Sequence, residues 1–189
     1  FIKVQRLLMM NDHSRIFDFL QFQLETFPKA DMLTSKVDGI WKPYSTAEVK
    51  TLVDSLSAGL LNAGISGNDM QVNNQDKVAL ISKNRPEWMI LDLACQQIGA
   101  TLCPVYPTTN VNELEFIFND AGVKMVFVSG EDILSKVSSI RDRVPTLKSV
   151  YSFDDLPGAD SWAKILATPE QVQASNLEGV KKSILPRHC

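Results

Sequence analysis

The sequence predicts an α/β fold, in which a mostly parallel sheet is flanked by helices on both faces in three layers. Short apolar runs alternate with segments of helical length between residues 77 and 153. These segments are long enough for right-handed crossovers between parallel strands. The apolar runs contain few polar residues, as expected of strands covered on both faces.

Two elements are predicted ahead of the sheet. Residues 14–27 carry apolar side chains at helical spacing, and Pro28 ends this helix. Residues 31–43 predict a hairpin, because Asp38 and Gly39 lie between apolar runs and glycine tolerates a positive φ.

The helix that begins after Ser45 has the clearest boundaries. Ser45 and Glu48 have the spacing of a capping box, and Gly64 is typical of a helix end. One face carries an apolar stripe of Val49, Leu52, Val53, Leu56 and Leu60. Residues 66–75 are polar and rich in Gly, Asn and Asp, which predicts a surface loop.

Strands and helices then alternate. The strands are expected at residues 78–82, 101–105, 125–128 and 149–153, with helices between them at 86–98, 110–120 and 131–144. Pro86 favours a helix start, whereas Gly99, Gly122 and Pro145 mark helix ends.

After residue 158 the sequence loses its sheet pattern. Two helices are expected at residues 162–166 and 169–180, the second capped by Thr168. The organisation predicted from this pattern is an N-terminal segment over residues 1–75, a parallel-sheet unit over 76–155 and a helical C-terminal segment over 156–189.

Composition excludes several classes of protein. The net charge is -3 and no run of Lys or Arg marks a nucleic-acid surface. No apolar stretch is long enough for a transmembrane helix, and residues 1–10 are too short and too interrupted for a secretory signal. Three cysteines without a C-x-x-C pattern indicate a reducing compartment, and Cys95 and Cys103 are expected to be buried, inert thiols.

The sequence offers no catalytic or metal-ligating set. His13 and His188 have no partner at metal-ligand spacing and are interpreted as solvated side chains. Asp154 and Asp155 are interpreted as turn residues with local hydrogen bonds, a metal role being the alternative. Neither a nucleophile motif nor a glycine-rich phosphate loop occurs.

The segment from Asn84 to Trp88 carries the candidates for a substrate-side role. It follows the first strand of the alternating unit, and ligands of parallel sheets bind beyond the carboxyl ends of strands. Arg85 could attract an anion there. The structural alternative is that Asn84 caps the next helix and Trp88 packs in the core. Tyr106 follows the second strand and is expected at the same edge.

The ordered motifs resemble the adenylate-forming, AMP-binding enzyme superfamily. Residues 41–49 resemble its first conserved motif, 76–88 the following strand and helix start, and 97–108 its second motif. The Arg-Pro-Glu-Trp form at residues 85–88 is most similar to the long-chain fatty-acid–CoA ligase branch, or acyl-CoA synthetases. The resemblance continues in order through 113–119 and 126–128, and covers nearly the whole chain.

This resemblance implies activation of a fatty acid by ATP and magnesium to an acyl-adenylate, then transfer of the acyl group to coenzyme A. The family's phosphate loop, adenine and ribose contacts and catalytic lysine lie downstream, so no cofactor-binding residue is expected in this chain. We therefore expect an N-terminal part, truncated before the phosphate loop and inactive alone. Residues 66–75 and 187–189 depart from the family pattern.

Two other functions stay open. One is a standalone α/β interaction or regulatory module that lost the chemistry. The other is a flavodoxin-like nucleotide-binding module, which the missing phosphate loop disfavours. The resemblance implies a cytoplasmic location, with peripheral membrane association as the alternative. Self-association through exposed apolar surface is also expected.

Overall fold

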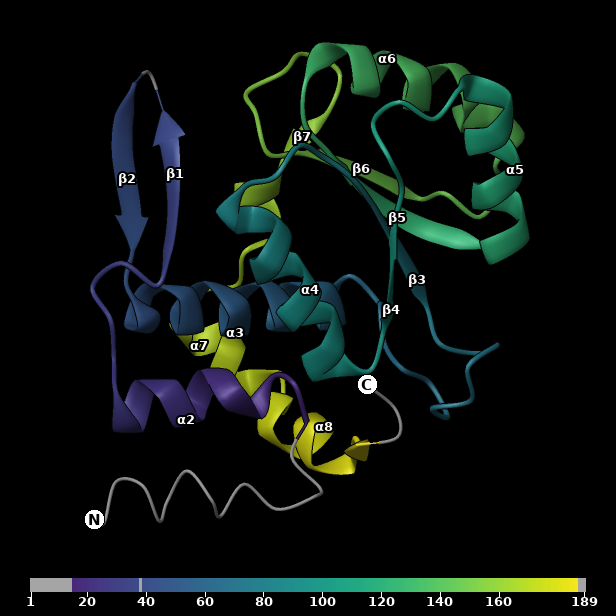
Figure 1. Cartoon of the computed structure of the whole chain (residues 1–189). Helices are drawn as coiled ribbons and strands as arrows, with labels where there is room; N and C mark the ends of the chain where they lie inside the picture. The colour runs from purple at the N-terminus through teal and green to yellow at the C-terminus, as the bar shows by residue number, and fades with distance from the viewer. Residues whose placement is uncertain (1–14, 38, 187–189) are drawn as a thin grey trace.

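The computed structural model describes residues 15–37 and 39–186 and confirms the α/β class (Figure 1). Its central layer is a five-stranded parallel sheet with the strand order β4-β3-β5-β6-β7. A two-stranded antiparallel hairpin precedes this sheet in the chain. Residues 1–10, His13, Asp38, His188 and Cys189, on which some of the sequence-based expectations fall, lie outside the described residues.

The predicted N-terminal helix and hairpin are both present. Helix α2 spans Asp18–Thr26, and the hairpin pairs β1 (Leu33–Val37) with β2 (Ile40–Tyr44). Gly39 has a φ of 81°, the conformation for which the turn prediction required glycine.

Helix α3 (Thr46–Asn62) has the predicted capping box. The Ser45 hydroxyl accepts a hydrogen bond from the Glu48 N–H at 3.2 Å, and the Ser45 N–H donates to the Glu48 carboxylate at 2.7 Å. Gly64, with a φ of 79°, follows the helix as expected.

The alternating unit forms as predicted, with shifted boundaries. Its strands are β3 (Lys77–Ile81), β4 (Thr101–Pro104), β5 (Val123–Val128) and β6 (Ser149–Ser152), and its helices are α4 (Pro86–Ile98), α5 (Val111–Ala121) and α6 (Glu131–Ile140). The helix expected to reach residue 144 is shorter, because a 3-10 turn at Arg141–Arg143 replaces its last residues. The sequence pattern missed β7 (Asp160–Ser161), whose two residues are too few to show alternation.

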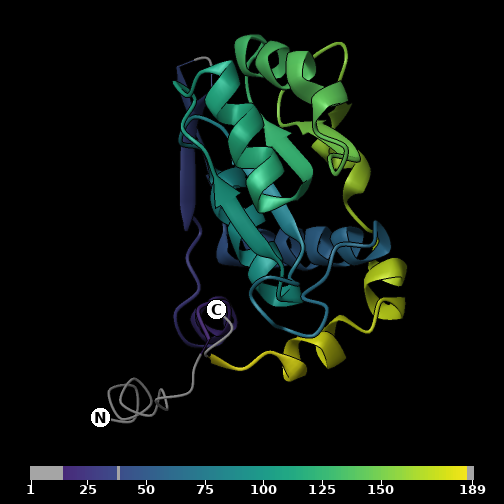
Figure 2. The ribbon, with the colours of Figure 1, turned by 90° about the vertical axis from the view of Figure 1, so that its right-hand side faces the viewer.

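Each face of the sheet has its own apolar core, as alternating side chains of a strand require. Val78 and Leu80 of β3 face the layer that contains α2, α3 and α4. Ala79 and Ile81 face the opposite layer, formed by α5 and α6. Figures 1 and 2 show the sheet between these two layers.

The segment after the fourth strand differs from the prediction. Residues 162–165 form a 3-10 helix, η2 (Trp162–Ile165), and the single helix expected over 169–180 is wrong. It is divided into α7 (Pro169–Ala174) and α8 (Leu177–Ser183) by Asn176, whose φ of 54° interrupts the helical path. Thr168 caps α7 in a capping box, as predicted.

The hairpin projects alongside the sheet in both views (Figures 1 and 2). Ile40 and Trp41 near its turn are 67% and 66% exposed, so only its base reaches the core, through Leu33 and Tyr44. Among the described residues, no helix has the length and hydropathy needed to cross a bilayer.

Candidate functional site

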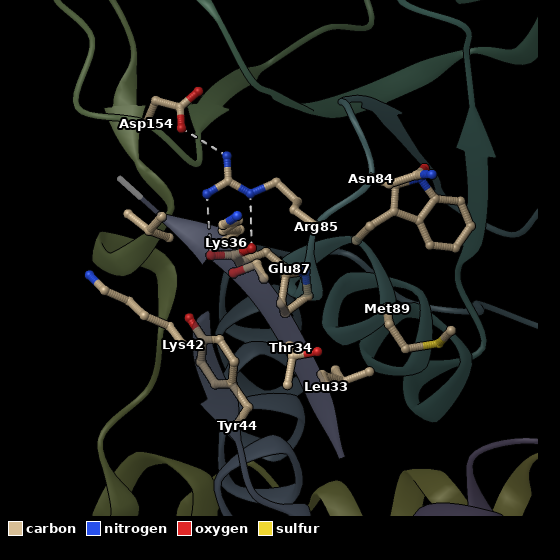
Figure 3. Close-up of a pocket in the computed structure, with 14 residues that line it drawn as sticks. Leu33, Thr34, Lys36, Lys42, Tyr44, Asn84, Arg85, Glu87, Met89 and Asp154 are labelled. Atoms are coloured by element: carbon tan, nitrogen blue, oxygen red, sulfur yellow. Dashed lines mark hydrogen bonds and ion pairs between the residues drawn. The ribbon is translucent and has the colours of Figure 1, made fainter. Parts of the chain in front are cut away.

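A groove of about 750 Å³ lies between the hairpin and the start of α4. Strand β1 and Lys42 and Tyr44 of β2 form one wall, and residues 84–89 form the other. Asp154, from the segment after β6, completes the lining. Figure 3 shows these side chains around the groove. Its volume is within the range of small-molecule sites, about 300–1,000 Å³.

Arg85 joins the elements around this groove. Its Nε donates to Oε2 of Glu87 at 2.8 Å, and its Nη1 donates to Oδ1 of Asp154 at 2.8 Å (Figure 3). The other Asp154 oxygen, Oδ2, accepts the Gly130 N–H at 2.8 Å. The guanidinium also lies 5.1 Å from the centre of the Phe153 ring. One cation therefore connects the ends of β3, β5 and β6 at one edge of the sheet.

These contacts determine the charges of the site. Burial acts to raise the pKa of Asp154, but the contacts with Arg85 and the Gly130 N–H outweigh it and lower that pKa. Burial acts to lower the pKa of Arg85, and the two carboxylates more than offset that effect. Burial, followed by the charge of Glu87, raises the pKa of the Tyr44 hydroxyl. The ion pair is thus charged at neutral pH, whereas Tyr44 is neutral.

The predicted candidates only partly converge. Asn84, Arg85 and Trp88 line the groove, but Tyr106 does not and is 82% exposed. The expectation that Asn84 caps α4 is wrong, because Arg85 is the N-cap residue and no side chain caps this helix. Trp88 is half-buried against the core rather than fully enclosed. A substrate role for these residues remains a prediction.

No sequence pattern marks Lys36, Lys42 and Tyr44 as parts of a site. Their strands were predicted, but no local pattern indicates that the hairpin lies beside α4. Asp154 was interpreted as a residue of a local turn. Its carboxylate instead accepts hydrogen bonds from Arg85 and Gly130, which are distant in sequence. A strand-end carboxylate was the only available signal for this contact.

The strand order indicates a second place where a ligand could bind. In parallel sheets of this flavodoxin-like order, ligands bind where neighbouring connections diverge, here between β3 and β5. Gly130 precedes α6 at that point, and the Asp154 carboxylate already accepts its N–H. At this edge of the sheet the Asp154 carboxylate thus lies between Arg85, which follows β3, and the start of α6. Within residues 15–37 and 39–186, no group of three or more His, Cys, Asp or Glu could hold a metal ion.

The two described cysteines are free thiols. Cys95 is buried as predicted, and burial strongly raises its pKa. Cys103 is only half-buried, so the prediction of a fully buried thiol is wrong at this position. Burial also raises the pKa of Cys103, and the charge of Lys77 partly opposes this. A raised pKa keeps both groups protonated and therefore weakly nucleophilic.

Comparison with known proteins identifies the family. The profile of the family described as AMP-binding enzyme matches residues 20–183. The long-chain-fatty-acid–CoA ligase FadD15 of Mycobacterium tuberculosis is 26% identical over 114 residues, which are 60% of this chain and 18% of that protein. Long chain acyl-CoA synthetase 2 of Arabidopsis thaliana is 28% identical over 142 residues, or 74% and 21% of the two chains. The chain thus spans about a fifth of the length of these relatives.

Solved structures have the same fold. A putative long-chain-fatty-acid CoA ligase from Rhodopseudomonas palustris superposes with a TM-score of 0.69 and 23% identity, covering 84% of this chain and 37% of that one. Acetoacetyl-CoA synthetase from Streptomyces lividans gives a TM-score of 0.69 with 19% identity, over 82% and 25% of the respective chains. At these identities the likeness concerns the fold alone.

Proposed function

The chain belongs to the AMP-binding enzyme family, and we propose that it is the N-terminal part of an ATP-dependent long-chain fatty-acid–CoA ligase. The observation that carries this proposal is the family match over residues 20–183, together with relatives named as long-chain ligases. The whole enzyme would use a fatty acid, ATP with magnesium, and coenzyme A. We propose a cytoplasmic location, which the free thiols of Cys95 and Cys103 support.

The reaction of the whole enzyme has two steps. A carboxylate oxygen of the fatty acid attacks the α-phosphorus of ATP and displaces pyrophosphate, which gives an acyl-adenylate. The thiol of coenzyme A then attacks the acyl carbon, loses its proton and displaces AMP. Both steps need oriented groups that stabilise the developing charge. The printed sequence contains no glycine-rich phosphate loop, so we propose that this chain alone catalyses neither step.

Two features disfavour the flavodoxin-like nucleotide-binding alternative. The turn between β3 and α4, where such folds bind phosphate, contains no glycine-rich loop. The Asp154 carboxylate, which contacts Arg85 of that turn, would also repel a phosphate. A standalone interaction module remains the rival function. Exposed apolar side chains, among them Trp41, Tyr106 and Phe116, support self-association at micromolar concentration under either function.

The test compares this chain with the complete protein encoded by its gene, each purified and supplied with a long-chain fatty acid. Exchange of labelled pyrophosphate into ATP measures the first step, and formation of acyl-CoA measures the second. We expect both activities from the complete protein and neither from this chain. Exchange by the chain above a no-enzyme control would overturn the proposed inactivity. A complete protein that forms no long-chain acyl-CoA would overturn the ligase assignment.

A further inference from the structure

We propose that the free edge of β1 receives a further strand from the part of the complete protein that follows this chain, so that the two-stranded hairpin gains a third strand. The added segment would lie in the groove between β1 and α4 and pair with the backbone of Thr34 and Lys36. This inference rests on the proposed function, because only a longer protein contains such a segment. It concerns an interaction surface and involves no step of the ligase reaction.

The register of the hairpin decides which backbone groups of β1 face away from β2. Opposite residues in an antiparallel pair alternate between hydrogen-bonded and non-hydrogen-bonded pairs. Thr34 lies opposite Pro43, which has no N–H, so this pair is of the non-hydrogen-bonded kind. The same holds for Lys36 and Trp41, two positions along. The N–H and C=O groups of Thr34 and Lys36 therefore point away from β2, and no backbone hydrogen bond joins them to a described residue outside the hairpin.

This free edge of β1 faces the groove. All five residues of β1 line the groove, whereas β2 contributes only Lys42 and Tyr44. β1 is also the strand that contacts α4, and Figure 1 shows it between β2 and α4. Neighbouring strands lie about 4.7–4.9 Å apart, so a strand added to β1 would occupy the groove itself.

The other strand edges of the described chain are closed to pairing. The free edge of β2 carries Pro43, which cannot donate a hydrogen bond. On β4, the N–H groups of Thr101 and Val105 donate toward β3, so Leu102 and Pro104 face outward, and Pro104 has no N–H. The opposite edge strand, β7, has only two residues. Proline and short length prevent unwanted strand pairing, and their absence from β1 indicates an edge that has a partner.

The hairpin also lacks the packing that stabilises an isolated pair of strands. Leu33 and Tyr44 at its base pack against the core, whereas Ile40 and Trp41 near its turn are exposed. A two-stranded hairpin is marginally stable in water unless a third strand or another element packs against it. A strand added to β1 would supply this support.

The size of the related proteins indicates where the strand comes from. This chain spans about a fifth of the length of the relatives described above, so most of a complete protein lies outside it. A segment of the same polypeptide is present at a high effective concentration beside the groove. A separate partner would instead lose translational and rotational freedom on binding.

The side chains of β1 define the chemistry of the added strand. Leu33 and Val37 lie on one face of β1, so the residues opposite them should be apolar. Lys36 lies on the other face, where its ammonium is 5.9 Å from the Trp41 ring and forms no ion pair with a described residue. Opposite charges stabilise directly opposed strand residues, so we expect a carboxylate opposite Lys36.

The experiment is hydrogen exchange with residue-level mass spectrometry, which compares this chain with the complete protein encoded by its gene. We expect the amides of Thr34 and Lys36 to exchange at least about tenfold more slowly in the complete protein. The Trp41 amide faces the other edge of the hairpin and should exchange equally in both proteins. Equal exchange of Thr34 and Lys36 in the two proteins would overturn the proposal, as would protection of Trp41 in their place.

Dilution distinguishes a strand of the same polypeptide from a second copy of the protein. Protection in the complete protein should not change with concentration. Protection that disappears on dilution would assign the edge to a second molecule and overturn the proposed occupant. Exchange is measured without substrates. A complete protein that protects these amides but forms no acyl-CoA would therefore contradict the ligase assignment alone, and an active protein with unprotected amides would contradict this inference alone.

Two matched proline variants of the complete protein locate the pairing. Lys36→Pro removes an N–H from the β1 edge and Trp41→Pro removes one from the β2 edge, and neither removes a hydrogen bond within the hairpin. Lys36→Pro should accelerate exchange of the Thr34 amide at least about tenfold, whereas Trp41→Pro should leave it unchanged. An equal effect of both variants would overturn pairing at β1. The comparison of the unsubstituted proteins tests the proposal even where a variant does not fold.

Discussion

Substituting Gly59 by alanine sets helix propensity against tertiary packing. Gly59 lies within α3, where alanine is favoured over glycine by about 1 kcal/mol. A Cβ at this position would overlap the carbonyl oxygen of Ile165 and lie 2.9 Å from its carbonyl carbon. Because Ile165 belongs to η2, the whole turn must move away from α3 to accept the methyl group.

The contacts that would be lost determine the magnitude. Ile165 is 7% exposed, and burial of such a side chain contributes about 1.5–3 kcal/mol. Ser55 and Ala167 exchange two hydrogen bonds of 2.6 and 3.1 Å beside this contact, each worth about 1 kcal/mol. These terms outweigh the gain in propensity. We expect Gly59→Ala to lower the free energy of unfolding by about 3 kcal/mol.

Urea unfolding followed by far-UV circular dichroism measures this loss. With the slope expected for a protein of this size, the midpoint should fall by about 1–2 M. Thr51→Ala, at an exposed position of the same helix, serves as the propensity control and should leave the midpoint unchanged or raise it slightly. A Gly59→Ala midpoint equal to or above that of the unsubstituted chain would refute the packing argument.

Three further predictions follow from single contacts. Ser45→Ala removes the cap of α3 and should cost about 1 kcal/mol in the urea assay; an unchanged midpoint would mean that the capping box contributes nothing. Trp88→Ala should lower the free energy of unfolding by about 1–2 kcal/mol, because the half-buried ring removes less apolar area from water than a fully buried ring does. Removing a fully buried ring costs about 3–5 kcal/mol, so a loss in that range would identify Trp88 as a core residue. Asp154→Asn should cost about 1 kcal/mol at neutral pH. The pKa of Asp154 in the folded chain lies below its ordinary 3.8. The difference in unfolding free energy between the variant and the unsubstituted chain should therefore persist above pH 3.8 and disappear as the pH falls through the folded pKa. A difference that does not change with pH would rule out the charged contact.

Elements with strong local signals were predictable from the sequence. Ser45 with Glu48 fixed the start of α3, and Gly99 and Gly122 marked the ends of α4 and α5, where both adopt left-handed conformations. Elements that depend on tertiary contacts were not predictable. The two-residue strand β7 exists only through pairing with β6, and the division at Asn176 has no proline or glycine to mark it. Apolar periodicity reports which face is buried, but not where a short helix ends.

The candidate site shows the same division between local and distant information. Arg85 was a reasonable candidate for an anion contact, because the sequence places a guanidinium at a strand end. The structure surrounds it with Glu87 and Asp154, the second of which lies 69 positions away. An anion approaching Arg85 would have to displace a carboxylate that is already paired with it. Lys36 and Lys42 have no such internal partner in the described chain, so the cations available to a ligand come from the hairpin. The sequence around a residue can identify a positive charge, but only the tertiary contacts determine whether a carboxylate already neutralises it.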